Sequence, residues 1–182
     1  MSRRLSGSLT CYNRPMTTSQ LSTKTLTLIP QNREQALAMV DAMTPEDRVH
    51  VSPEWLAAVR ASASIDPWMH GFAIVHRDTG RTIGNCGFTG PPADGVAEIA
   101  YGIDSEHQGN GYATEAAEAL TNFAFAQNVR AVRAHTLPET NASTRVLTKC
   151  GFRHVGPVID PQDGPVWRWE RHREQPPEPH VP

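Results

Sequence analysis

Residues 103–115 read IDSEHQGNGYATE, and this stretch decides the fold of the chain. Residues 96–103 have the composition of a strand. After them, apolar residues recur with the period of a helix, at Ala113, Ala116, Ala117, Leu120, Phe123 and Ala124, and polar residues take the other face, at Glu115, Glu118, Thr121 and Asn122. The peptide N–H groups between strand and helix therefore lie at a helix N-terminus, which favours an anion. Because Gly109 and Gly111 carry no Cβ, a ligand can approach the backbone, and we predict a cradle for a phosphate or pyrophosphate.

Two common phosphate-binding motifs do not fit this stretch. A P-loop needs GxxxxGK[ST], and the chain contains no Gly-Lys pair. The dinucleotide fingerprint needs a small third residue where Thr114 stands. It also needs an acidic residue about 20 positions further on, yet none lies between Glu118 and Glu139. The composition of the stretch excludes both classes.

A third phosphate-binding pattern does match. Residues 108–113 (QGNGYA) resemble the Q/R-x-x-G-x-G/A signature with which GCN5-related N-acetyltransferases (the GNAT family) hold the pyrophosphate of acetyl-CoA. Residues 141–152 (NASTRVLTKCGF) resemble the second motif of that family, in the version of the ribosomal-protein N-acetyltransferase (RimJ/RimL) branch. The resemblance covers roughly residues 25–171, and the two motifs together make it specific.

The resemblance implies an acetyl-CoA-dependent N-acetyltransferase. The eight histidines have no spacing typical of a metal site, so we expect no metal ion. The strand that ends at Ile103 and a strand at residues 131–136 would splay apart around the pantetheine arm, and backbone groups near Ile103 would pair with the arm and donate to the thioester oxygen. Asn141 and Ser143 would line the arm near the sulfur. The residues implied to hold the pyrophosphate are Gln108, Gly109, Asn110, Gly111, Tyr112 and Ala113.

The chain departs from the family pattern at two positions. Thr140 stands where many relatives have an asparagine three residues before the serine, and Asn141 is one residue closer. Leu147 stands where other branches carry a tyrosine that acts as the general acid. The group that protonates the departing thiolate therefore stays open between Ser143, a solvent molecule and no side chain at all.

The implied reaction is direct attack of a neutral primary amine on the thioester. A free α-amine has a pKa of about 7.7–8.0 and lysine one near 10.4, so an α-amine needs only a weak base. Glu98, on the strand beside the implied reaction centre, is the first candidate for this base, with Asp160, Asp163 or water as alternatives. We interpret His135 as a hydrogen-bonded structural residue. Three functions stay open: acetylation of a protein N-terminus, acetylation of a small-molecule amine, and non-catalytic binding of acyl-CoA.

The rest of the chain alternates between strand and helix signals. Strand signals lie at residues 25–29, 71–77, 82–88, 96–103, 131–136, 152–159 and 166–171. The tight turns that join 71–77, 82–88 and 96–103 predict an antiparallel meander of these three strands. Helix signals begin at an Asn32–Gln35 capping box, at Ser52, at the stretch quoted above and at Asn141, with Gly151 as a stop. We therefore expect one α/β domain of the α+β type at residues 24–171, with a mixed, mostly antiparallel sheet of about seven strands flanked by about four helices.

Both ends of the chain are predicted to be unstructured. Residues 1–23 are rich in Ser, Thr and Arg, and residues 172–182 contain four prolines. Met16 opens the segment MTTSQLSTKTLTL and is an alternative to Met1 as the start of translation.

Charge and cysteine usage exclude several classes of partner. The net charge of the chain is −2. Residues 1–24 carry +4 and residues 172–182 carry −1, so residues 25–171 carry −5. This negative charge is a poor match for nucleic acid. Cys11, Cys86 and Cys150 form no CxxC pair and indicate reduced thiols rather than a zinc site or disulfides. Without an apolar run for a membrane span or a signal peptide, we expect a cytoplasmic protein. A homodimer stays open.

Overall fold

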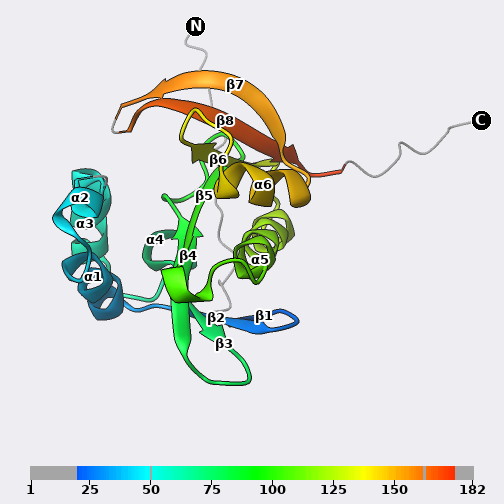
Figure 1. The fold of residues 1–182 in the computed structure, drawn as a ribbon. Coiled ribbons are helices and arrows are strands. Elements are labelled where there is room, and N and C mark those ends of the chain that lie inside the picture. Colours follow the sequence, from blue (N-terminus) through cyan, green and yellow to red (C-terminus); the bar gives the residue numbers. More distant parts are fainter. Residues whose placement is uncertain (1–19, 50, 162, 175–182) are drawn as a thin grey trace, which may run out of the picture.

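The computed structural model describes residues 20–49, 51–161 and 163–174, and its strands form one sheet (Figure 1). The order is β1-β2-β3-β4-β5-β6-β8-β7, and all neighbouring strands are antiparallel except β5 and β6. The strands are β1 (Leu21–Ser22), β2 (Leu26–Pro30), β3 (Phe72–His76), β4 (Thr82–Phe88), β5 (Val96–Ile103), β6 (Ala131–Thr136), β7 (Arg153–Asp160) and β8 (Gly164–His172). The mixed, mostly antiparallel sheet is confirmed, with eight strands in the described part of the chain.

Four helices of eight residues or more accompany the sheet within the described ranges, as expected. They are α1 (Arg33–Asp41), α3 (Pro53–Ala61), α5 (Tyr112–Ala126) and α6 (Ala142–Lys149). Two single turns, α2 (Pro45–Arg48) and α4 (Pro67–His70), and the 3-10 helix η1 (Ser105–His107) complete the described elements. In Figure 1, α5 and α6 lie on one side of the sheet and α1 to α3 on the other.

The ends of the helices are defined by local capping. Asn32 and Gln35 form the predicted capping box at α1, and Ser52 caps α3 through the backbone N–H of Trp55. At the end of α6, Gly151 adopts a φ of +74°, the left-handed conformation that stops a helix and that glycine adopts at little cost. Each of these signals acts over a few residues, so the sequence alone was sufficient to predict it.

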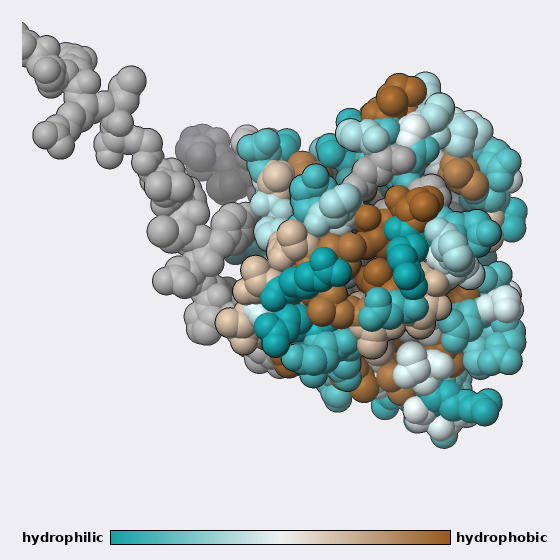
Figure 2. Space-filling model, turned by 90° about the vertical axis from the view of Figure 1, so that its left-hand side faces the viewer, coloured by the Kyte–Doolittle hydropathy of each residue, from teal (hydrophilic) through white to brown (hydrophobic). Residues whose placement is uncertain are grey.

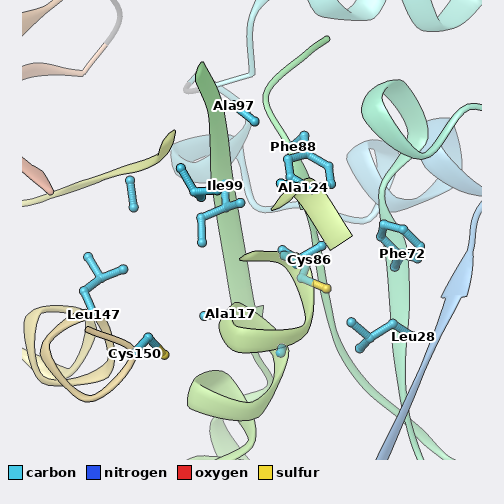
Figure 3. Packing of buried hydrophobic residues seen from close by; sticks show 14 of the residues in the cluster. Leu28, Phe72, Cys86, Phe88, Ala97, Ile99, Ala117, Ala124, Leu147 and Cys150 are labelled. Carbon is cyan, nitrogen blue, oxygen red and sulfur yellow. The ribbon is translucent and has the colours of Figure 1, made fainter. Parts of the chain in front are cut away.

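The core lies between the sheet and the α5–α6 layer. Leu147 from α6, Cys150 at the C-cap of that helix and Ala117 from α5 pack near Ile99 of β5 (Figure 3). One prediction about α5 was wrong: Thr121 is buried rather than on the polar face. Its hydroxyl donates to the carbonyl of Ala117 at 2.7 Å, and this bond satisfies the polar group within the helix itself.

The predicted tails fall largely outside the described residues. Within residues 20–23, β1 pairs with β2, so this short part of the predicted N-terminal tail is a strand. At the other end, β8 reaches His172, the first residue of the predicted C-terminal tail. Met1, Cys11 and Met16 lie outside the described residues. No helix in the described ranges is long and apolar enough to cross a membrane.

Candidate active site

The site begins where β5 and β6 separate. These parallel strands pair only at Val96–Glu98 against Ala131–Arg133, although β5 continues to Ile103 and β6 to Thr136. On its other edge, β5 stays paired with β4 as far as Ile103. The β6-facing edge of β5 beyond Glu98 is therefore unpaired with a strand, and its backbone groups can bind an extended ligand.

One end of this unpaired edge leads to a cradle of main-chain nitrogens. Gly109 and Gly111 have φ values of +80° and +84°, and a Cβ built at either would meet no atom within 4 Å. Gly111 is the N-cap of α5, so the first amides of that helix have no intrahelical acceptor. The geometry of the loop fits an anion held by backbone N–H groups.

Two predicted pyrophosphate ligands use their side chains differently. The side-chain amide of Gln108 donates to the carbonyl of Ile103 at 2.9 Å. The side-chain amide of Asn110 donates to the carbonyls of His107 and Gln108 at 3.0 and 3.1 Å. Both side chains therefore shape the loop. These two residues can offer a ligand their backbone N–H groups. The other members of the set, Tyr112 and Ala113, form the first turn of α5.

Glu115 anchors the first turn of α5 to Thr25, the residue before β2. Its carboxylate accepts from the backbone N–H and the hydroxyl of Thr25, at 2.6 and 2.7 Å. Burial raises the pKa of Glu115, but hydrogen bonds from Thr23, Thr25 and Leu26 outweigh it, and the pKa lies below its ordinary value. Glu115 is thus ionised at neutral pH, and it holds the cradle against the sheet.

At the other end of the unpaired edge lies a cavity of about 510 Å³. Its walls come from β5, β6, the start of α6, the β7–β8 turn and the residue before α3. They include Ser52, Thr89, Glu98, Tyr101, His135, Ser143, Asp160 and Asp163. The structure therefore brings together around one cavity all four side chains considered above for proton transfer: Glu98, Ser143, Asp160 and Asp163.

A larger depression, of about 1810 Å³, runs along the outer face of α5 between β1 and the end of β8. It includes Gly111 from the cradle but none of these four side chains. The smaller cavity is therefore the better candidate for the reaction centre. Figure 2 shows the side of the molecule that carries α1 to α3, where hydrophobic residues emerge between hydrophilic ones.

His135 lies between two of the candidate bases. Its Nδ1 is 3.3 Å from a carboxylate oxygen of Glu98 and 3.8 Å from one of Asp160. Its Nε2 accepts from the Nε of Arg168 at 3.4 Å. Sequence reasoning treated this residue as structural and gave Arg168 no role, because the contacts join residues of four strands, β5, β6, β7 and β8, that are separated along the chain. No group of three or more His, Cys, Asp or Glu side chains in the described ranges has the arrangement of a metal site.

Asn141 is occupied by capping. Its side-chain oxygen accepts from the backbone N–H of Thr144 at 3.1 Å, and its own backbone N–H donates to the Thr144 hydroxyl at 3.0 Å. Asn141 does not line the cavity, whereas Ser143, two residues later, does. The contribution of Asn141 to the site is therefore the start of α6, which positions Ser143.

Sequence reasoning missed Tyr101. Its hydroxyl is buried and has no hydrogen-bond partner among the residues that the structure describes. Burial raises the pKa of Tyr101 above its ordinary range and the nearby Ser143 side chain only partly offsets this, so the group stays protonated. A tyrosine among the core-facing residues of β5 was the available signal, because a hydroxyl buried there needs a partner.

Leu147 stands where other branches carry the tyrosine general acid, and its side chain has no exposed surface and belongs to the core. Restoring a tyrosine there should therefore destabilise the fold. We predict that Leu147→Tyr lowers the free energy of unfolding by about 1–3 kcal/mol, since the larger ring overpacks the core and its hydroxyl is buried there. The same change at exposed Lys149 should stay within about 0.5 kcal/mol. Denaturant unfolding of both variants tests this, and equal stabilities would contradict it.

Comparison with known proteins gives the family. The sequence model "Acetyltransferase (GNAT) domain" matches residues 14–153, more than half of the chain. The uncharacterized N-acetyltransferase p20 of Bacillus licheniformis is 31% identical over 99 residues, which cover 53% of this chain and 56% of that protein. The chain is thus aligned with only about half of that relative's length.

Two solved structures share the fold. The ribosomal-protein-S5-alanine acetyltransferase of Vibrio fischeri has a TM-score of 0.61 at 15% identity, covering 85% of this chain and 96% of that one. AAC(6')-Ib in complex with ribostamycin and coenzyme A has a TM-score of 0.63 at 19% identity, covering 82% and 94%. At these identities the two solved structures establish only that the fold is shared, while the sequence-model match over residues 14–153 establishes the family. This chain belongs to the GNAT acetyltransferase family.

Proposed function

We propose that this protein transfers the acetyl group of acetyl-CoA to a primary amine. One observation carries the proposal: the unpaired edge of β5 has an anion cradle at one end and, at the other, a cavity that contains Glu98. Such an edge suits a ligand that has a diphosphate at one end, an amide-containing arm in the middle and a reactive group at the other end.

The residues present fit acetyl-CoA. The open space at Gly109 and Gly111 suits a diphosphate, and the unpaired backbone groups of β5 suit the amides of the pantetheine arm. The unpartnered hydroxyl of Tyr101 in the wall of the cavity suits a polar group of the ligand. When bound, acetyl-CoA supplies the activated acyl group.

The side chains of the cavity supply what the transfer needs. Glu98 takes the proton from the attacking amine, directly or through water, and a positioned base of this kind contributes about 10²–10⁴-fold. A backbone N–H near Ile103 donates to the thioester oxygen as charge develops on it, which is worth about 3–4 kcal/mol. The hydroxyl of Ser143 faces the same cavity and is our candidate donor to the departing sulfur.

The acceptor we favour is the α-amine of a protein N-terminus. At pH 7 roughly a tenth of an α-amine is neutral, against well under a thousandth of lysine, so a carboxylate is a sufficient base. The carboxylates of Glu98, Asp160 and Asp163 line the cavity and would attract an acceptor that arrives as a cation. The same charges suit a small-molecule amine, which is the second candidate. We also propose a cytoplasmic location, in keeping with the free thiols of Cys86 and Cys150.

Turnover of acetyl-CoA with a panel of amines, followed by thiol release, tests the function. We expect peptides with a free N-terminus to react at least about tenfold faster than lysine with a blocked α-amine, because more of the α-amine is neutral at pH 7. The same peptides with a blocked N-terminus are the control. Binding of acetyl-CoA without thiol release for any amine would instead indicate a non-catalytic acyl-CoA-binding module.

A further inference from the structure

We propose that Arg168 and His135 are positioning residues: Arg168 fixes His135 in the tautomer that carries its proton on Nδ1, and this N–H holds the carboxylate of Glu98 in place. The inference rests on the proposed function, because it explains how Glu98, the proposed base, is held in place. Its first test needs neither acetyl-CoA nor turnover.

The three side chains lie on three neighbouring strands. His135 of β6 is the cross-strand partner of Arg168 of β8. On the other side, Glu98 of β5 is the partner of Arg133, two residues before His135 on the same face of β6. The register therefore brings the three side chains to one face of the sheet, with His135 opposite Arg168 and diagonal to Glu98, although they are 37 and 33 positions apart in sequence.

The contact with Arg168 selects the tautomer. An arginine Nε always carries a hydrogen and can only donate, so at 3.4 Å the Nε2 of His135 is the acceptor and has no proton. In a neutral imidazole the single proton is then on Nδ1. This is the nitrogen that faces Glu98 at 3.3 Å and Asp160 at 3.8 Å.

This arrangement excludes His135 as the base and makes it a support for one. The lone pair of Nε2 is engaged by Arg168, and Nδ1 already holds a proton, so neither nitrogen can take one from an amine. The carboxylate oxygen nearest to Nδ1 is Oε1 of Glu98. The His135 and Glu98 side chains are 13% and 28% exposed, so this contact is partly shielded from water.

The charged groups around His135 come from the strands and the turn that surround it. Glu98 faces it from β5, Asp160 from β7 and Arg168 from β8, and Asp163 of the β7–β8 turn lines the same cavity. In the next pair along β6 and β8, the two residues bind each other: Arg133 donates to Glu170 through its Nε and a terminal nitrogen, at 3.0 and 2.9 Å. Arg133 is therefore committed to Glu170, and the support of Glu98 falls to His135.

Nitrogen NMR of the ligand-free protein with labelled histidine tests the tautomer directly. At neutral pH we expect His135 to show a protonated Nδ1 and an unprotonated Nε2. Arg168→Met removes the donor and should produce a mixture of tautomers. The same change at Arg81, an exposed residue of the β3–β4 turn, should leave the His135 signals unchanged. A proton on Nε2 in the unaltered protein, or an unchanged spectrum in Arg168→Met, would overturn the proposal whatever the protein acetylates.

Kinetics separate positioning from a merely structural role. His135→Leu should lower kcat about 30-fold with little change in the KM for acetyl-CoA. His135→Asn, whose amide N–H can stand near the position of Nδ1, should recover most of that loss. In a Glu98→Gln background, His135→Leu should cost nothing further, because the two residues act as one unit. Equal losses in the Asn and Leu variants, or fully additive effects with Glu98→Gln, would show that His135 only supports the fold and would refute the inference.

Discussion

Substituting Gly111 by valine should weaken the binding of coenzyme A by at least about 30-fold, which corresponds to about 2 kcal/mol. Gly111 has a φ of +84°, where a β-branched side chain is strained, and the added carbons would occupy the open space above the first amides of α5. A diphosphate could then no longer reach those amides. Calorimetric titration with coenzyme A measures the loss.

Gly80 provides a matched control for this experiment. It has a φ of +67° at the exposed β3–β4 turn, and a Cβ built there also meets no atom within 4 Å. Gly80→Val should therefore lower the free energy of unfolding to a similar degree, by about 1–3 kcal/mol, yet leave the affinity for coenzyme A unchanged. If both variants bind coenzyme A as tightly as the parent protein, the cradle does not hold the diphosphate. If the parent itself gives no binding heat, the proposed function fails.

Substituting Glu98 by glutamine should lower kcat at pH 7 by about 100-fold, because the amide cannot accept the proton of the attacking amine. The KM for acetyl-CoA should change less than about twofold, since the cradle lies at the other end of the β5 edge. The rate of the variant should recover partly as the pH rises toward 8.5, where most of an α-amine is already neutral. Steady-state kinetics with a free-N-terminus peptide measure all three.

The control for Glu98 is an acidic residue of the same type away from the cavity. Glu46 lies exposed in α2, and Glu46→Gln should leave both kcat and KM unchanged. An unaltered kcat in Glu98→Gln would transfer the role of the base to Asp160, Asp163 or water. Asp160→Asn and Asp163→Asn, measured in the same way, would then separate these alternatives.

Much of the fold was readable because the signals are local. The Asn32–Gln35 capping box, the stop at Gly151 and the apolar stripe of α5 each depend on residues within a few turns of one another. The loop before α5 belongs to the same group, because its two glycines directly precede an amphipathic helix. That its backbone N–H groups hold a diphosphate stays a prediction. Thr121 is the exception within α5: a threonine can satisfy its hydroxyl on the preceding turn and then be buried.

The chemistry of the cavity depends on contacts that cannot be predicted from the sequence alone. The family resemblance implies that Asn141 lines the pantetheine arm, and the structure shows that its side-chain oxygen caps α6. In the sequence Tyr101 looks like one more apolar strand residue. The structure shows that its buried hydroxyl has no hydrogen-bond partner among the described residues. Arg168 carries no motif at all and gains its contact with His135 only through the pairing of β6 with β8.

The amino-acid sequence by itself determined most of the helices and strands, the glycine-containing loop that opens α5 and the resemblance that led to the family, since each rests on residues close together in the chain. Only the tertiary structure decided where β5 leaves β6 and which side chains meet around Glu98. The physical reason is register: a shift of one residue between two strands turns every side chain to the opposite face, and this alignment is set by packing across the whole sheet.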